Sequence, residues 1–112
     1  MAVKGKIRAE EIKVETGWAD YVFKEDYDLP TLEEVKDHIE EKGHLINIPS
    51  AIEVKENGIQ LGEMNKLLLE KIEELTLYTL EQEKNLKSKN KRIDELEKRL
   101  EKIEEFLNPI KE

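Results

Sequence analysis

Apolar residues recur with a seven-residue period along the C-terminal half of the chain, at alternating steps of three and four. When Ile93 and Leu100 are assigned to a positions and Leu96 and Ile103 to d positions, the period is that of a coiled coil. The predicted seam consists of Leu68, Ile72, Leu75, Thr79, Gln82, Leu86, Lys89, Ile93, Leu96, Leu100, Ile103 and Leu107. We expect one long coiled-coil helix over residues 61–108, ended by Pro109, and a short tail over residues 109–112.

Charged residues beside this seam indicate how many chains share it. Two successive windows repeat the order Arg, apolar, any, any, apolar, Glu, which places each Arg at a g position and each Glu at an e position five residues later. There the Arg can cover the apolar core and bind the Glu of a neighbouring chain. The expected interchain ion pairs join Arg92 to Glu97 and Arg99 to Glu104. This order favours a parallel homotrimer, although Ile at a with Leu at d would by itself favour two strands.

Three seam positions are polar: Thr79, Gln82 and Lys89. One interpretation is that they lower stability while fixing register and oligomeric state. The other is a hydrated or ion-binding layer, because three Gln82 side chains would converge on the axis of a trimer. Both interpretations are structural rather than catalytic.

The N-terminal region has a different pattern. Residues 3–15 alternate apolar or small residues with charged ones, and the phase changes near Glu10, which predicts β structure with a bulge or turn. Residues 18–23 form a second, aromatic-rich strand candidate, in which alternation would place Ala19, Tyr21 and Phe23 on one buried face. A carbohydrate-binding platform made by Trp18, Tyr21 and Phe23 is the alternative.

The middle of the chain has clear helix signals. Thr31 with Glu34 forms a capping box and Gly43 supplies a left-handed stop, so a helix is expected over residues 32–42. A second capping box, Ser50 with Glu53, opens a short helix that ends at Asn57-Gly58.

The long helix carries more apolar residues in its first half than a seam requires, so the preceding residues are expected to cover it. Leu68, Ile72 and Leu75 are expected to belong both to the seam and to this covered surface. The predicted fold is α+β: a small N-terminal β/α head, residues 16–60, on a long C-terminal helix that forms a parallel trimeric coiled coil.

Composition limits the function classes. Charged residues make up 41% of the 112 residues and aromatic residues 5%, which leaves little material for a core within one chain. The net charge of −8 argues against a nucleic-acid partner, and no apolar run is long enough to insert into a membrane. Cysteine is absent, which excludes disulfides and thiolate metal sites.

No catalytic constellation is recognisable. The two histidines, His38 and His44, lack the spacing that would bring further metal ligands onto one face, and Ser50 is already used as a helix cap. We therefore expect a protein that is not an enzyme and has no catalytic residues, no cofactor and no metal site.

Several segments together resemble the C-terminal module of bacterial and phage tail-fibre-like proteins, with a layout similar to that of the endosialidase-type intramolecular chaperone. The segments are residues 4–14, 17–23, 44–51 and 58–65. The resemblance implies a trimerisation and folding module at the end of a fibre, with residues 1–15 as the end of a β shaft. Self-releasing modules of this type use a serine followed by an aspartate; residues 16–20 read Thr-Gly-Trp-Ala-Asp here, which implies that the module stays attached.

The expected function is trimerisation and assembly of such a fibre, and the alternative is a receptor-binding tip. The expected partners are two further copies of the chain, the preceding fibre shaft of the same chain and, for the alternative, a cell-surface receptor. The resemblance implies a fragment of a longer chain, located in a virion tail fibre, an injection-system fibre or on a bacterial cell surface.

Overall fold

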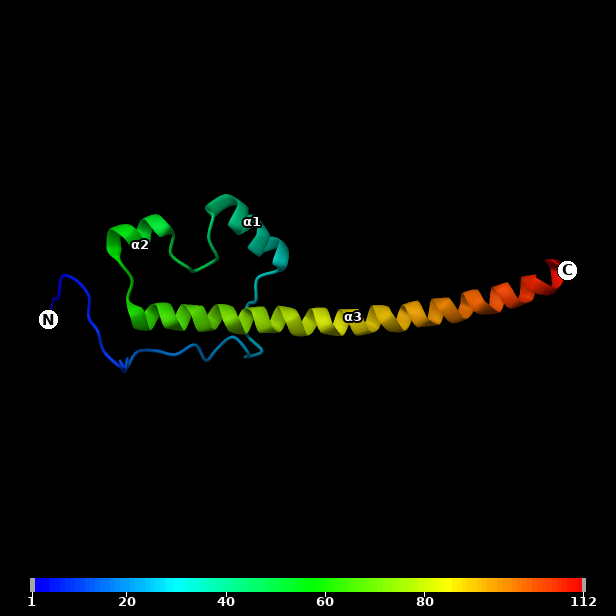
Figure 1. Ribbon diagram of the computed structural model, residues 1–112, viewed down its shortest axis with the longest axis horizontal. Helices are drawn as coiled ribbons and strands as arrows, with labels where there is room; N and C mark the ends of the chain where they lie inside the picture. Colours follow the sequence, from blue (N-terminus) through cyan, green and yellow to red (C-terminus); the bar gives the residue numbers. More distant parts are fainter. Residues whose placement is uncertain (1, 112) are drawn as a thin grey trace. The chain divides into compact units, whose positions relative to one another are not determined.

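Three helices form the regular structure of this chain in a computed structural model that describes residues 2–111, with side chains for residues 2–108. They are α1 (Leu32–Lys42), α2 (Ala51–Asn57) and α3 (Leu61–Lys111) (Figure 1). The chain divides into two units, Met1–Glu73 and Glu74–Glu112. The first unit contains α1, α2 and the start of α3, whereas the second consists of the remainder of α3.

The predicted α+β fold is wrong, because residues 2–111 contain no β-strand. Residues 2–16 have no regular secondary structure, with bends at Lys4, Gly5, Glu10 and Thr16, and residues 2–15 are all exposed. A strand is defined by hydrogen bonds to a neighbouring strand, and the alternating pattern supplies only one side of that pairing. The β/α head is therefore an α-helical unit with an extended N-terminal arm, which we define as residues 2–13.

The aromatic segment forms turns rather than a strand. The amide of Lys24 donates to the carbonyl of Tyr21 at 3.3 Å, and that of Tyr27 donates to Lys24 at 3.1 Å. The two buried apolar residues here are Ala19 and Val22, three positions apart, whereas alternation predicted a spacing of two. Phe23, expected in the core, is exposed.

The helix caps agree with the sequence analysis. The Thr31 hydroxyl accepts from the Glu34 amide at 3.1 Å, and Gly43 adopts the left-handed conformation at a φ of 80°. Ser50 and Glu53 form the reciprocal capping box, with bonds of 3.2 and 3.3 Å. Each cap satisfies backbone groups that a helix end would otherwise leave without partners. The predicted starts of both helices and the predicted end of α1 are therefore confirmed.

The last helix is longer than predicted. α3 continues through Pro109 to Lys111, whereas the sequence analysis ended it at residue 108. Proline removes a backbone donor and crowds the preceding turn, yet α3 includes two further residues beyond it. Of the predicted tail, residues 109–111 are helical and residue 112 lies outside the described residues.

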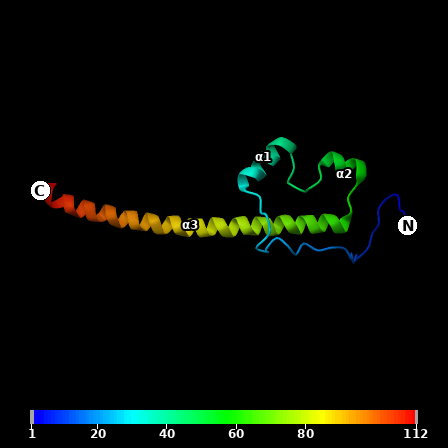
Figure 2. The same ribbon diagram turned by 180° about the vertical axis from the view of Figure 1, so that it is seen from behind.

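Within the first unit, the segment of residues 14–23 runs alongside the beginning of α3, as Figures 1 and 2 show from opposite sides. The contact is close at Gly62, where an added Cβ would lie 2.5 Å from Val14 Cγ1 and 2.6 Å from Thr16 Oγ1. Eight residues further along α3, Glu70 receives a hydrogen bond from Tyr21. The segment and the helix therefore run in the same direction, and an added Cβ at their closest approach would force the side chains of Val14 and Thr16 to move.

Candidate functional site: the exposed seam of α3

The predicted seam is an exposed row of apolar side chains. In the second unit, the seven apolar seam residues are 43–64% exposed: Leu75, Leu86, Ile93, Leu96, Leu100, Ile103 and Leu107. Large apolar side chains at regular helical spacing are costly to leave in water, and helix association along an a and d stripe is the usual way of burying them. The row can therefore form a helix-to-helix interface.

The first unit leaves its part of the seam exposed as well. Leu68 is 47% and Ile72 60% exposed, which corrects the expectation that these residues belong also to the covered surface. The covered face of α3 contains Leu67, Glu70 and Lys71 instead, at the c, f and g positions of the same heptads. The head thus covers α3 mainly on the side away from the seam.

The polar seam residues behave differently from one another. The Thr79 hydroxyl donates to the Leu75 carbonyl of the same helix at 2.9 Å, so its proton is already used within the chain. Gln82 and Lys89 are exposed. Both interpretations of these positions stay predictions.

Charges beside the seam form ion pairs within the helix. Arg92 lies 3.7 Å from Glu95, one turn away, and Lys87 lies 3.6 Å from Glu83. Both pairs are exposed, so each contributes little in the single chain and can exchange partners. The pairing of Arg92 with Glu97 and of Arg99 with Glu104 between chains stays a prediction.

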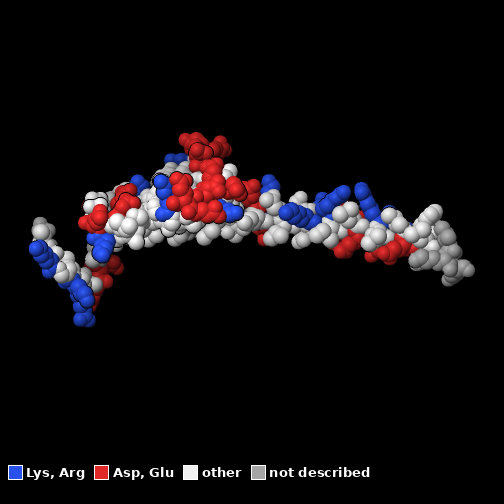
Figure 3. Space-filling model, turned by 90° about the horizontal axis from the view of Figure 1, so that it is seen from above, with Lys and Arg blue, Asp and Glu red and all other residues white. Residues whose placement is uncertain are grey.

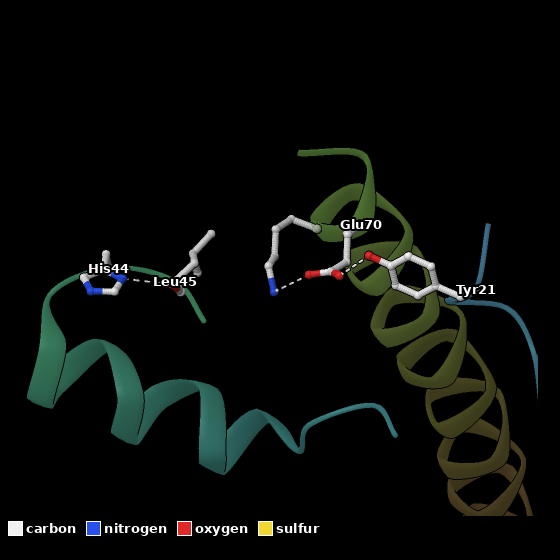
Figure 4. A network of polar contacts seen from close by, with 5 residues as sticks. Tyr21, His44, Leu45 and Glu70 are labelled. Carbon is white, nitrogen blue, oxygen red and sulfur yellow. Dashed lines mark hydrogen bonds and ion pairs between the residues drawn. The ribbon is translucent and has the colours of Figure 1, made fainter. Parts of the chain in front are cut away.

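A buried polar cluster fixes the segment of residues 14–23, which we call the arm-proximal segment, to α3 (Figure 4). Glu70 is only 4% exposed, and its carboxylate accepts a hydrogen bond from the Tyr21 hydroxyl. Its other oxygen, Oε2, has no hydrogen bond of good geometry but lies 3.3 Å from Lys71 Nζ. The Lys66 ammonium lies 6.0 Å from the centre of the Tyr21 ring, within cation–π range.

Two opposing effects act on the pKa of Glu70. Burial raises it by removing water from the carboxylate, but the hydrogen bond from Tyr21 and the nearby polar groups of Lys71 and Asn47, including the Lys71 charge, together lower it below its ordinary value of 4.5. Asn47 reaches this position in the left-handed conformation at a φ of 67°, which asparagine tolerates better than most residues. The carboxylate is therefore held ionised in the cluster.

Sequence analysis did not identify this cluster. A glutamate and a tyrosine 49 residues apart carry no mutual signal in the sequence. The one available hint was that Glu70 lies three residues after Leu67, an apolar residue off the seam on a part of the helix that was expected to be covered.

The remaining candidates from the sequence are His38, His44 and Ser50. The rings of His38 and His44 lie edge to face with centres 5.3 Å apart, and His44 Nδ1 is 2.9 Å from the Leu45 carbonyl. Among the residues with described side chains, no three His, Asp or Glu residues gather where a metal could bind. Ser50 caps α2 as expected.

No described helix combines the length and the apolar character that crossing a membrane requires. Comparison with protein families, with curated proteins and with solved structures found no match to this chain.

Proposed function

We propose that this chain is a parallel homotrimerisation module that gathers three copies of the polypeptide to which it belongs. The observation that carries the proposal is the exposed apolar row of α3, which coincides with the two windows that place Arg at g and Glu at e. Arg at g and Glu at e favour three strands, since each Arg can lie over the core and bind the neighbouring chain.

The energetics support association. Taking a Leu or Ile from half exposed to buried contributes roughly 1 kcal/mol, and seven apolar positions of the second unit would contribute in every chain. This exceeds what weak ion pairs such as Arg92 with Glu95 supply, so the apolar row provides the affinity and the charges select the number and direction of chains.

The biological role that fits such a module is the assembly of a fibre. Pairing of β-strands from separate chains is slow, and the unpaired strand edges are prone to aggregate until it is complete. A local helix that associates early would raise the effective concentration of the attached segments to the order of millimolar. The tail-fibre resemblance of residues 4–65 is consistent with this role.

The experiment replaces residues 86–112 in a chain that carries its natural preceding segment. Four versions are compared. Residues 86–112 are left intact, deleted, replaced by an unrelated trimeric coiled coil, or replaced by an unrelated dimeric coiled coil. Soluble trimer should be lost on deletion and partly restored by the trimeric fusion alone. Equal assembly of the deleted version would contradict the proposal.

A receptor-binding tip is the second candidate, and one observation favours it. Trp18 is 70% exposed and Phe23 is also exposed, so two aromatic faces are available for a glycan or a protein surface. The connector of residues 44–50, in contrast, is mostly half-buried. A Trp18→Ala variant that assembles normally but no longer attaches to cells would identify this function.

A further inference from the structure

The N-terminal arm (residues 2–13) is an apolar and basic segment without a covering surface in its own chain. Val3, Ile7 and Ile12 are 52–67% exposed, on a segment whose other residues are exposed too. Between them, residues 2–9 carry Lys4, Lys6 and Arg8 and no carboxylate. A segment of this kind fits an acidic surface with an apolar groove.

The arm leaves α3 on one flank of the seam. Its attachment is fixed by Val14 and Thr16 against Gly62, and Gly62 is an e position when the heptads of the seam are continued to the start of α3. From there the contact continues to Lys66 and Glu70, at b and f. The segment thus begins on the e flank at Gly62 and passes onto the outer face of the helix at Lys66 and Glu70.

An apolar groove lies on the other flank. It has a volume of about 190 Å³ and is lined by Pro49, Gly58, Ile59, Gln60, Glu63, Met64 and Leu67. In the same heptads Met64 is a g position and Leu67 a c position. Ile59 and Leu61, in and beside the groove, are about half exposed. The point at which the arm is attached, Gly62, and the groove residues Met64 and Leu67 therefore lie on opposite flanks of the seam.

In a parallel coiled coil the e flank of one helix faces the g flank of the next. Neighbouring axes lie about 10 Å apart, whereas the eight residues 2–9 span roughly 26 Å when extended. The arm starts from the e flank of its own helix, and this flank faces the g flank of the neighbouring helix. The groove nearest to that flank is therefore the groove of the neighbouring chain.

The charges of the two surfaces are complementary. Residues 16–60 carry eleven Asp and Glu against four Lys, so the head is acidic, and Glu63 lines the groove itself. Figure 3 shows acidic side chains gathered over the head and basic ones along the arm. Opposite charges steer the approach, and the apolar side chains of the arm supply contacts within the groove.

We infer that the arm of each chain docks into the groove at Pro49, Ile59 and Met64 of a second copy, so that the assembly is closed by arm exchange around its N-terminal end. This inference rests on the parallel association proposed above. Residues 2–9 lie across the neighbour's groove with Ile7 near Ile59, and Lys4, Lys6 and Arg8 face the acidic head.

The absence of cysteine allows a direct test by cross-linking. An affinity-tagged chain with Ile7→Cys is refolded with an untagged chain carrying Gln60→Cys, and a short bismaleimide is added. A control pair uses Lys24→Cys in place of Gln60→Cys. Lys24 is exposed in the head, but it follows directly after residues 14–23 and does not line the groove. A chain with both Ile7→Cys and Gln60→Cys, diluted in unsubstituted chain, reports cross-linking within one chain.

We expect the mixed adduct of Ile7→Cys with Gln60→Cys to form about tenfold faster than the control adduct, and to slow by a similar factor when Lys4, Lys6 and Arg8 are changed to Glu. Trimeric mass with equal adduct rates, or cross-linking mainly within one chain, would overturn arm exchange and leave trimerisation standing. A monomeric mass would overturn both.

Discussion

Tyr21→Phe removes one hydroxyl from the cluster that joins the arm-proximal segment to α3. Because Glu70 is 4% exposed, water cannot replace the lost donor, and the carboxylate keeps only the contacts with Lys71 and Asn47. Leaving a buried acceptor without its partner costs about 1–3 kcal/mol. We expect the free energy of unfolding of the first unit to fall by that amount.

Acidification gives the same prediction a second readout. A carboxylate with a lowered pKa stabilises the folded unit at pH values above the ordinary glutamate pKa of 4.5. This contribution is lost as the pH falls from there through the lower pKa that Glu70 has in the folded unit. Without the Tyr21 hydroxyl the pKa of Glu70 in the folded unit rises toward its ordinary value, so the stability lost on acidification should be smaller in the variant and should be complete at a higher pH. In Glu70→Gln this titration should disappear.

Urea unfolding at several pH values measures both effects, with Trp18 as the only indole in the chain. A cycle of Tyr21→Phe, Glu70→Gln and the double variant isolates the interaction, and the double variant should lose less than the sum of the single ones. If Tyr21→Phe unfolds at the same urea concentration as the unsubstituted chain, the cluster does not stabilise this unit.

Three further substitutions probe other parts of the structure. Gly62→Ala should destabilise the first unit by about 1–3 kcal/mol because its Cβ would collide with Val14 and Thr16, and Val14→Ala should restore part of this in a thermal melt. Ser50→Ala removes the capping box of α2 and should cost about 1 kcal/mol, measurable as faster amide exchange over residues 51–57. Gln82→Leu should raise the melting temperature of the assembly, since a polar seam position lowers stability; an unchanged or lower value would favour a hydrated or ion-binding layer.

Local signals were the reliable part of the sequence analysis. The caps at Thr31 and Ser50 and the stop at Gly43 depend on residues within four positions of one another, and the structure has all three. The long helix was predictable from its heptads for the same reason. Such features need no knowledge of which distant segments meet.

The errors arose where the outcome depends on a partner. The alternation in residues 3–15 predicts a strand only if another strand lies beside it, and none does in the described chain. Ala19 and Val22 are buried three positions apart, a spacing that no period-two pattern encodes. The Tyr21 to Glu70 contact and the close approach at Gly62 are likewise long-range, so only the folded chain reveals them.

The number of chains in solution tests the central proposal most directly. Sedimentation equilibrium at micromolar concentration should give three times the mass of one chain, and Ile93→Asp, which would bury three unpaired charges on the axis, should give the mass of a single chain. A mass of one, two or four chains for the unsubstituted protein would contradict the trimer.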